Sequence, residues 1–497
     1  MLCTGPIVML LAGCVSMAPA EQTPNIVSDI PDTFPSEVDG KPYKPAAWWN
    51  AFEDPVLDGL VTDALKNNLD IAEAAARLEQ VTAQARITRA SLLPSVSAGI
   101  SASQSSSPLA GSAFGDLGAG AINRIENETY SPSLSAAYEL DLFGRARNDY
   151  AAARQDAVAS AYDLQSVQLS AAAQAISAYF DIVDTRRQIE LTVLISDVLN
   201  DRAERTDEQF RRGLSDSFEL FQIRQELRSA QASLPQFESA LADTENRLAV
   251  LIGTYPQPLR QRLSQSLTPR LVFEPVPAGL PIDLLSQRPD VAANWARLDA
   301  ARLRIGARKA ERFPQISLSG SVGTQGDTVS AALDFADNWT TSLAANIVAP
   351  IFNAGRISAN IRSARALYDQ QAAIYARTVL TAYQESSSAI EDYEEQRQRY
   401  LLITAQLDDA ELSLDLQKRR FSAGVGSYVS YLDALTTVYR VQSDLSSSAR
   451  ATALARLSVH QALAGNWAPD IEPEKPPMTT QVEQSPPAAS DVQEDQQ

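Results

Sequence analysis

The chain has 497 residues, of which 45% are hydrophobic and only 7% aromatic, and its formal net charge is −19 at pH 7. This acidic balance disfavours nucleic acid as a partner, because a phosphate backbone attracts a basic surface. The only cysteines are Cys3 and Cys14, and the only histidine is His460. We therefore expect no disulfide framework and no His-rich metal site. We also expect no other metal site, no cofactor and no enzymatic activity.

The N-terminus begins with a pattern typical of export signals. Residues 7–13 read IVMLLAG, an apolar run that is too short to span a bilayer but suits the apolar part of a secretory signal. The run ends in Leu-Ala-Gly-Cys, which resembles the lipobox of bacterial lipoproteins and implies cleavage before Cys14 and acylation of that residue. Residues 1–13 contain no Lys or Arg, which departs from the usual signal pattern. We predict a signal peptide over 1–13 and a lipidated, extended segment over 14–46.

The body of the chain repeats itself. The tetrapeptide FRRG at 210–213 is matched by FSAG at 421–424, 211 positions later, and Gly144-Arg145 is matched by Gly355-Arg356 at the same offset. The stretches LLPSVSAG (92–99) and RFPQISLS (312–319) also match, with their prolines 220 positions apart. We predict two repeats, 47–253 and 281–467, joined by a linker over 254–280. The tail 468–497 is rich in Pro, Gln and acidic residues and is predicted to be disordered.

Each repeat contains the same predicted order of helices and strands. In the first repeat these are a helix over 55–92, strands over 95–104 and 131–143, and helices over 145–212 and 217–252. In the second they are a helix over 281–311, strands over 315–324 and 339–352, and helices over 355–422 and 428–464. Each longest helix would span about 100 Å and needs neighbours along its length.

The last helix of each repeat carries apolar residues at 3-4 spacing, which is typical of coiled-coil-like packing. In the second repeat, Ser448 and Thr452 are exceptions to this pattern. His460 flanks a heptad position at Val459, and we predict that it lies on the polar surface.

The predicted strands alternate apolar with small polar residues, as in QISLSGSVG over 315–323. Each has about the ten residues that a tilted strand needs to cross a bilayer, and in lipid it must belong to a closed barrel. Four strands cannot close a barrel, whereas a trimer supplies twelve. Glu139 and Asp141 lie on the polar side and are predicted to line the lumen rather than to form an acid–base pair. The alternative is an antiparallel sandwich with one solvated face.

Several longer stretches carry a family resemblance. They include YELDLFGRAR (138–147), PIFNAGRI (350–357) and AGVGSYVSYLDA (423–434). With them, the chain resembles the outer-membrane efflux channel family (TolC-like), in the lipoprotein branch that serves RND-type pumps. The resemblance implies a mixed α/β membrane protein: a homotrimer with a shared 12-stranded transmembrane β-barrel and a long periplasmic α-helical barrel. It further implies an outer-membrane location, a periplasmic adaptor and an inner-membrane RND-type pump as partners, and passive export of drugs, other toxic compounds or metal ions.

The resemblance also implies a gate and docking tips at the periplasmic end. Val429 and Asp433 match family positions that face the pore axis, and a spacing of four places both on one helix face. Arg420 matches an arginine that ties the closed tip, and Phe421 stands where a Tyr is usual, which puts a hydroxyl-mediated latch there in doubt. The predicted adaptor-docking tips are the two interhelical turns: Gly213, Leu214, Gly424, Val425 and Gly426.

Two other functions compete with the efflux conduit. One is a related outer-membrane channel for type I protein secretion. The other, of a different class, is a structural coiled-coil lipoprotein without a pore.

Overall fold

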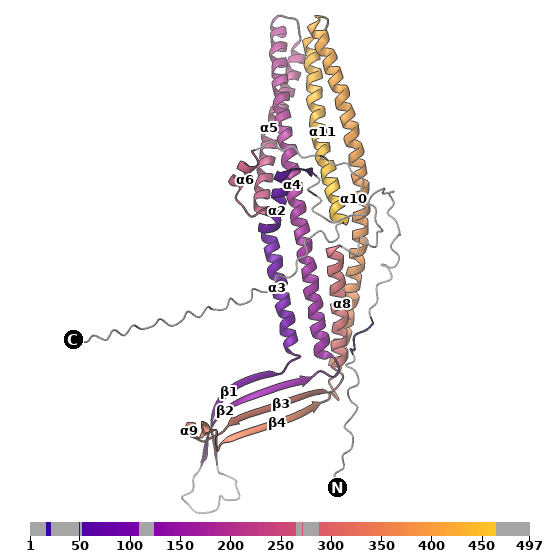
Figure 1. Ribbon diagram of the computed structural model, residues 1–497. Coiled ribbons are helices and arrows are strands. Elements are labelled where there is room, and N and C mark those ends of the chain that lie inside the picture. Colours follow the sequence, from indigo (N-terminus) through magenta and orange to yellow (C-terminus); the bar gives the residue numbers. More distant parts are fainter. Residues whose placement is uncertain are drawn as a thin grey trace, which may run out of the picture.

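The computed structural model describes residues 16–20, 49, 52–108, 124–264, 271 and 288–463. Cys14, the signal peptide, most of the predicted linker and the predicted tail lie outside the described residues. The chain forms a long bundle of helices with a sheet at one end and two helix-to-helix connections at the other (Figure 1).

The two halves place their elements in the same order. The first half contains α2 (Pro55–Asn67), α3 (Leu69–Ala90), β1 (Ser95–Pro108), β2 (Arg124–Leu140), α4 (Arg145–Arg211) and α5 (Ser217–Leu251). The short helix α6 (Pro256–Arg262) follows, within the predicted linker. The second half contains α8 (Pro289–Ala310), β3 (Gln315–Thr324), α9 (Val329–Ala332), β4 (Trp339–Val348), α10 (Arg356–Ser422) and α11 (Tyr428–Leu463). Both α4 and α10 have 67 residues.

The glycines that frame α4 and α10 also correspond between the halves. Gly144 and Gly355 precede these helices with φ of 77° and 83°, and Gly213 and Gly424 follow them with φ of 74° and 75°. A side chain is strained in this left-handed region, whereas glycine is not. The same backbone geometry therefore starts and ends both long helices.

The prediction of one continuous helix before the first strand is wrong. The range 55–92 forms two helices, because Asn68 adopts an extended conformation (φ −64°, ψ 131°) between α2 and α3. Its side-chain Oδ1 accepts a hydrogen bond from the backbone N–H of Ile71 at 3.0 Å, which caps α3. Asn is among the best residues for this position, because its oxygen satisfies an N–H that lacks a helical partner.

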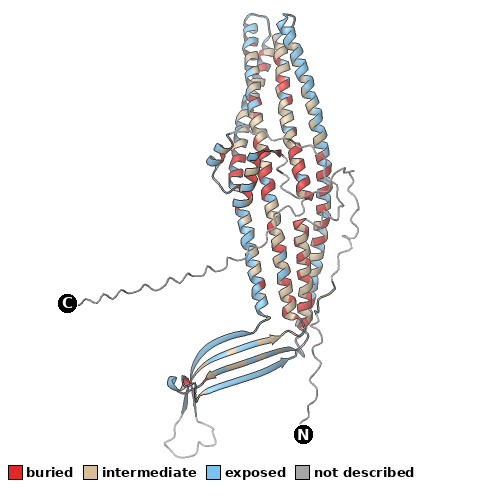
Figure 2. Cartoon of the chain, in the orientation of Figure 1, coloured by how far each residue is buried: buried red, intermediate tan, exposed pale blue. Residues whose placement is uncertain are grey.

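The helices form columns around α4. On one side α4 packs against α3 and α5, and on the other against α8 and α11, while α10 packs against α8 and α11. The main core lies midway along the bundle, where α2, α4 and α5 meet, and its largest fully buried side chain is Tyr179 (Figure 2). No helix within the described ranges combines the length and apolarity needed to cross a membrane.

The polar residues in the α11 pattern are buried rather than exposed. Ser448 and Thr452 continue the packed seam, and the Thr452 hydroxyl donates to the Ser448 carbonyl at 2.9 Å. Such a bond satisfies the hydroxyl inside a helix. The prediction for His460 is wrong: the side chain is buried, and this burial, with the nearby Arg456 charge, lowers the pKa of His460 to about 3.

The four strands form one antiparallel sheet in the order β1-β2-β3-β4. The predicted bounds of three strands are wrong: β1 ends at 108 instead of 104, β2 covers 124–140 instead of 131–143, and β4 ends at 348 instead of 352. The β1–β2 pairing continues through polar partners such as Gln104 with Glu128. Because both faces are polar there, the alternation that marks the strands in the sequence is absent from this extension.

Candidate functional site

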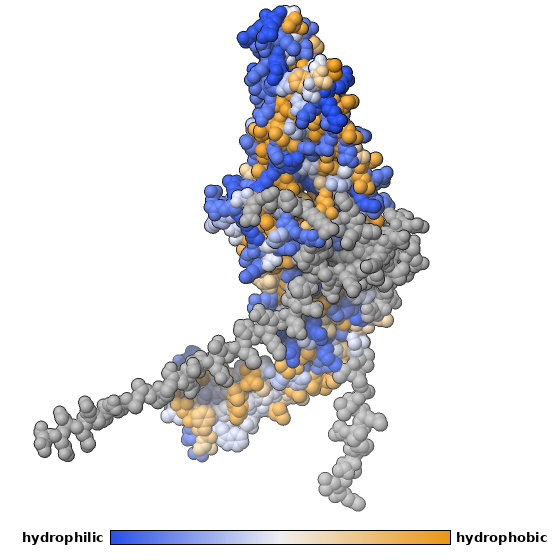
Figure 3. Space-filling model, turned by 45° about the horizontal axis from the view of Figure 1, so that its top comes forward, coloured by the Kyte–Doolittle hydropathy of each residue, from blue (hydrophilic) through white to orange (hydrophobic). Residues whose placement is uncertain are grey.

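The sheet separates an apolar face from a hydroxyl-bearing face. Strand pairing aligns Leu134 with Val322 and Tyr138 with Leu318, and the latter continues to Ala345 on β4. Because neighbouring side chains in a strand point to opposite faces, these residues share one face. Ile100 on that face is 84% exposed in the single chain. Figure 3 shows apolar residues gathered over the sheet and along parts of the helices.

On the other face, one serine from each strand forms a row across the whole sheet. Ser97 pairs with Ser135, Ser135 with Ser321, and Ser321 with Ser342. Their hydroxyl oxygens lie 2.8 Å apart in the first and last of these pairs. This serine row is polar and uncharged, so it can border water without attracting either sign of ion.

The two acids predicted to line the lumen lie at the base of the polar face. Arg145 Nη2 donates to both carboxylate oxygens of Glu139 at 2.8 and 2.9 Å. Asp141 accepts from the backbone N–H of Arg147 at 2.8 Å and from its Nε at 3.3 Å. Both arginines belong to the first turn of α4, so these pairs fasten the sheet to the helical shaft. Lumen lining by the two acids stays a prediction.

The turns at the far end have matching geometry in the two halves. The backbone N–H of Leu214 donates to the Gln209 carbonyl at 2.8 Å, and that of Val425 donates to the Arg420 carbonyl at 3.0 Å. Both helices thus end in the glycine-dependent motif that satisfies carbonyls of the last turn. Leu214 and Val425 are 75% and 71% exposed, so each turn presents one bare apolar side chain.

Gly426 has a different role from the other tip glycines. A side-chain carbon at this position would lie 2.8 Å from the backbone nitrogen of Phe421. The residue therefore permits close packing of the turn against the end of α10, although its φ is not in the left-handed region.

Two of the predicted gate residues, Val429 and Asp433, lie in the first turns of α11, whereas Arg420 and Phe421 lie in the last turn of α10. Asp433 forms an ion pair with Arg202 of α4, and its side chain remains 52% exposed. Val429 lies one turn earlier and is half-buried. Arg420 is exposed and forms no ion pair with any residue that the structure describes. Within one chain, the tie to Asp433 thus comes from Arg202, and a tie through Arg420 stays a prediction.

A hydroxyl-mediated contact does exist at the tip, but at a different position from the one considered. Tyr428 donates its hydroxyl to Asp201 of α4 at 2.5 Å, and Arg205 donates to the same carboxylate at 3.0 Å. The Arg205 guanidinium lies 4.0 Å from the centre of the Tyr428 ring, and the Phe421 ring packs against Tyr428 at 5.0 Å. The hydrogen bond to Asp201 raises the pKa of Tyr428, which keeps the donor proton in place. Sequence reasoning missed Tyr428, although it lies only seven positions beyond Phe421, across the turn between α10 and α11.

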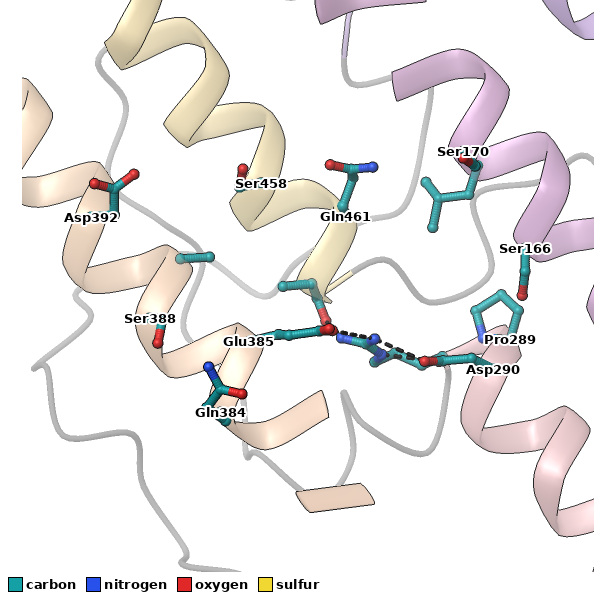
Figure 4. A pocket seen from close by; sticks show the side chains of 14 residues that line it. Ser166, Ser170, Pro289, Asp290, Gln384, Glu385, Ser388, Asp392, Ser458 and Gln461 are labelled. Atoms are coloured by element: carbon teal, nitrogen blue, oxygen red, sulfur yellow. Dashed lines mark hydrogen bonds and ion pairs between the residues drawn. The ribbon is translucent and has the colours of Figure 1, made fainter. Parts of the chain in front are cut away.

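A hollow of about 580 Å³ lies midway along the shaft, where α8 and α11 meet end to end (Figure 4). Arg288 spans it: Nη2 reaches Glu385 of α10 at 2.7 Å and Asp290 at 2.9 Å, and Nη1 donates to the Ala462 carbonyl at 3.2 Å. The side chain is only 10% exposed, and these partners balance its charge. The described residues contain no cluster of metal-ligating side chains here or elsewhere.

The short N-terminal segment 16–20 lies against the base of α4 and α8. Ser16 donates its hydroxyl to Asn148 Oδ1 at 2.8 Å, and Arg302 Nη1 donates to the Pro19 carbonyl at 2.8 Å. A side-chain carbon at Gly306 would lie 2.6 Å from the Ala18 nitrogen, so only glycine leaves room for this segment. Sequence reasoning missed this N-terminal seat, because its parts are far apart in the chain.

These features define a class of protein: a channel-forming membrane protein in which a two-faced sheet continues into a long helical shaft. The sequence profile of the outer membrane efflux protein family matches residues 60–254 and 280–465, and the chain belongs to that family. It is an outer-membrane efflux channel component whose helical part extends into the periplasm.

Relatives match over nearly their whole length. The toluene efflux pump outer membrane protein TtgC of Pseudomonas putida is 30% identical over 476 residues, covering 92% of this chain and 94% of the relative. The cation efflux system protein CusC of Escherichia coli is 28% identical over 475 residues, covering 93% and 97%. The solved structure of the outer-membrane channel OprN superposes with a TM-score of 0.78 at 26% identity, covering 92% of this chain and 100% of OprN.

Proposed function

We propose that three copies of the chain close into a twelve-stranded β-barrel and a coaxial α-helical barrel, forming the passive outer-membrane conduit of a tripartite efflux system. The difference in burial between corresponding helices carries this proposal. In the single chain α8 buries eleven residues, whereas α3, its counterpart, buries only Ala85. Likewise α4 buries twenty residues and α10 only nine. The underburied helices lie at opposite edges of the chain (Figure 1), as expected where the next copy packs.

The sheet supports the same assembly. Within one chain β1 and β4 are edge strands, and Leu343 on β4 is 88% exposed. In lipid an unpaired edge costs several kcal/mol for each unsatisfied backbone group. Because four strands are too few to close, further copies must pair with both edges.

The proposed partners are a periplasmic adaptor at the tips and an inner-membrane RND-type pump behind it. The bare Leu214 and Val425 side chains at the two turns offer small apolar contacts for such an adaptor. Relatives are named for toluene, pyoverdine and cation export. We propose drugs, other toxic compounds or metal ions as cargo, with the choice made by the pump, because an uncharged serine-lined bore selects little.

The proposed gate is the start of α11. Three copies of Asp433 would form an acidic ring and three of Val429 an apolar constriction, the kinds of ring by which pores select and close. The pairs Arg202–Asp433 and Tyr428–Asp201 hold α11 against α4. Opening the tip would require these contacts to break, so they set the resting closed state.

The proposed anchor is lipid on Cys14. Two residues of chain reach at most about 7 Å, so the acylated residue is tethered that close to Ser16. Ser16 itself contacts Asn148 in the first turns of α4, directly after the sheet. The N-terminal seat would therefore hold the lipid beside the base of the barrel.

A deletion strain tests the function against a panel of drugs, solvents and metal salts. We expect increased sensitivity to at least one class, restored by the intact gene. Unchanged sensitivity together with loss of a secreted protein would favour type I secretion instead. Purified protein that stays monomeric and conducts no ions across a planar bilayer would contradict the channel and favour the coiled-coil lipoprotein.

The gate is tested by Tyr428→Phe, which removes the hydroxyl bonded to Asp201 but keeps the aromatic packing. We expect larger or more frequent openings in planar bilayers. Tyr431→Phe is the matched control, because this neighbouring ring stacks on Phe421 and donates no hydrogen bond to a described residue. Equal conductance in both variants and the wild type would remove Tyr428 from the gate.

A further inference from the structure

Two hollows lie at corresponding places in the two halves of the chain. The first is the hollow around Arg288, and the second, of about 660 Å³, lies beside Asn68. Seven lining residues of the second hollow have counterparts 211 positions later in the first. Four of these pairs join α4 to α10: Gln174 and Glu385, Ser177 and Ser388, Ala178 and Ala389, Asp181 and Asp392. The other three join α5 to α11: Arg247 and Ser458, Val250 and Gln461, Leu251 and Ala462. Three more have counterparts 220 positions later: Asn68 and Arg288, Leu69 and Pro289, Asp70 and Asp290. The two hollows are thus versions of one site.

They differ in one wall. The hollow around Arg288 is closed by a further stretch of α4: Ser166, Leu169 and Ser170. The hollow beside Asn68 has no corresponding wall among the residues that line it. The counterparts of that wall, 211 positions later, are Arg377, Leu380 and Thr381 of α10. In Figure 1, α10 lies at the edge of the chain opposite to α3 and α5, so this chain's own α10 is not placed to supply the wall.

In a closed ring the missing wall comes from the neighbouring copy. Within the chain, α4 of the first half packs against α8 and α11 of the second. If the second half of one copy packs in the same way against the first half of the next copy, α10 packs against α3 and α5 of that copy. We propose that the open hollow is an inter-subunit site completed by Arg377, Leu380 and Thr381 of the next copy, with Arg377 paired to Asp70. This inference rests on the proposed trimer.

The charges at the site are complementary. Figure 4 places Ser166 beside Pro289 and Asp290, and the counterparts of these three are Arg377, Leu69 and Asp70. Asp70 and Arg377 are both exposed, and neither has an ion-pair partner within the described ranges. The other acid of the hollow, Asp181, is already paired with Arg450. Asp70 is therefore the carboxylate that remains for an incoming arginine.

The apolar residues at the two edges support the same contact. Leu69 and Val250 at the open hollow are 71% and 72% exposed, and Leu380 on α10 is 53% exposed. Leu169, the counterpart of Leu380, is packed against the core where the wall is present. Docking of the next copy would cover Leu69, Val250 and Leu380 together, which favours the contact through burial of apolar surface.

Thiol cross-linking tests the contact, because the chain has no cysteine beyond residue 14. In outer membranes, Asp70→Cys with Arg377→Cys treated with a short bismaleimide is expected to give dimer and trimer bands. Asp70→Cys with Arg365→Cys is the control, since Arg365 is exposed but lies about 18 Å further along α10. A channel that conducts as a trimer but gives no bands with the first pair would overturn this inference and leave the proposed function standing. A monomer without conductance would overturn both.

Charge exchange supplies a second readout. Asp70→Arg and Arg377→Asp are each expected to lower the temperature at which trimers dissociate in detergent, through repulsion between like charges. The double exchange is expected to restore it, because the opposite charges meet again. Two single losses that simply add in the double variant would overturn the pairing, even where the trimer itself persists.

Discussion

The side chain of Asn68 joins two helices that follow one another in space but not in sequence. Its Nδ2 donates to the carbonyl of Leu251, the last residue of α5, at 2.9 Å, while its Oδ1 caps α3. Arg288 precedes α8 in the same way and donates to the carbonyl of Ala462, near the end of α11. Each residue satisfies a carbonyl that has no helical partner, so α5 continues into α3, and α11 into α8, as one column.

We predict that Asn68→Ala destabilises the protein more than Asn68→Ser. Serine still caps α3 but is too short to reach Leu251, whereas alanine loses both contacts. The expected cost is about 1 kcal/mol for the bond to Leu251 and about 1 kcal/mol more for the cap. Thermal unfolding followed by circular dichroism gives the order. Asn67→Ala, at an exposed neighbouring position, is the control, and equal midpoints for all three variants would contradict the role of Asn68.

The sequence predicts the local structure well where a repeating pattern exists. Alternation located all four strands, and the 3-4 spacing located α5 and α11. The break at Asn68 was missed because its second partner, Leu251, lies 183 positions away. His460 was misplaced because its neighbour Val459 occupies the seam, while burial at the end of α11 depends on how other helices surround it.

The candidate site was predictable to the same extent. Spacing placed Val429 and Asp433 on one stretch of helix, but not the α4 partner Arg202, which is 231 positions from Asp433. Phe421 stands where the family usually has a Tyr, which indicated a missing hydroxyl. The structure instead supplies a hydroxyl from Tyr428, which contacts Asp201, a residue 227 positions from it in the chain. Contacts between the two halves depend on how the long helices are aligned, and no local pattern encodes that alignment.

We predict that His460 makes the protein less stable in acid. Its folded pKa of about 3 lies below the ordinary value of 6.5, so the unfolded chain binds the proton more tightly. Stability is therefore lost as pH falls from about 6.5 towards 3, with a slope of about 1.4 kcal/mol per pH unit from this group. Denaturant unfolding of the wild type and His460→Gln at pH 7 and pH 4.5 measures it. The variant is expected to lose less stability between these values, and parallel losses would contradict the prediction.

We predict that Gly306→Val expels the N-terminal segment from its seat. The valine side chain would occupy the position of the Ala18 backbone, which lies 2.6 Å from the added carbon. A spin label on Ala20→Cys is expected to be immobile in the wild-type background and mobile in the variant. Arg86→Val is the control, because Arg86 is the counterpart of Gly306 in α3 and is exposed. A label that stays immobile in Gly306→Val would show that the seat does not depend on this glycine.

The pairing of β2 with β3 predicts how two copies join their sheets. Leu134 lies opposite Val322 in the chain, and the counterparts of these residues are Ala345 on β4 and Ala102 on β1. The counterpart of a β1 residue lies 220 positions later on β3, and that of a β2 residue lies 211 positions later on β4. These offsets carry the pair Ser95 with Ala137 onto the pair Gln315 with Val348.

We therefore expect Ala345→Cys of one copy to form a disulfide with Ala102→Cys of the next. Directly opposite residues in an antiparallel pair have Cα atoms about 4.5–5.5 Å apart, within the range of about 4.4–6.8 Å that a disulfide spans. Ala344→Cys with Ala102→Cys is the control, because a shift of one residue moves the thiol to the other face of the sheet. Dimer and trimer bands under oxidation, absent in the control and removed by reductant, would establish this register. Bands from the control pair alone would show that the closing strands are shifted by one residue. The pairing of β4 with β1 between copies would then differ from the pairing of β2 with β3 within a chain.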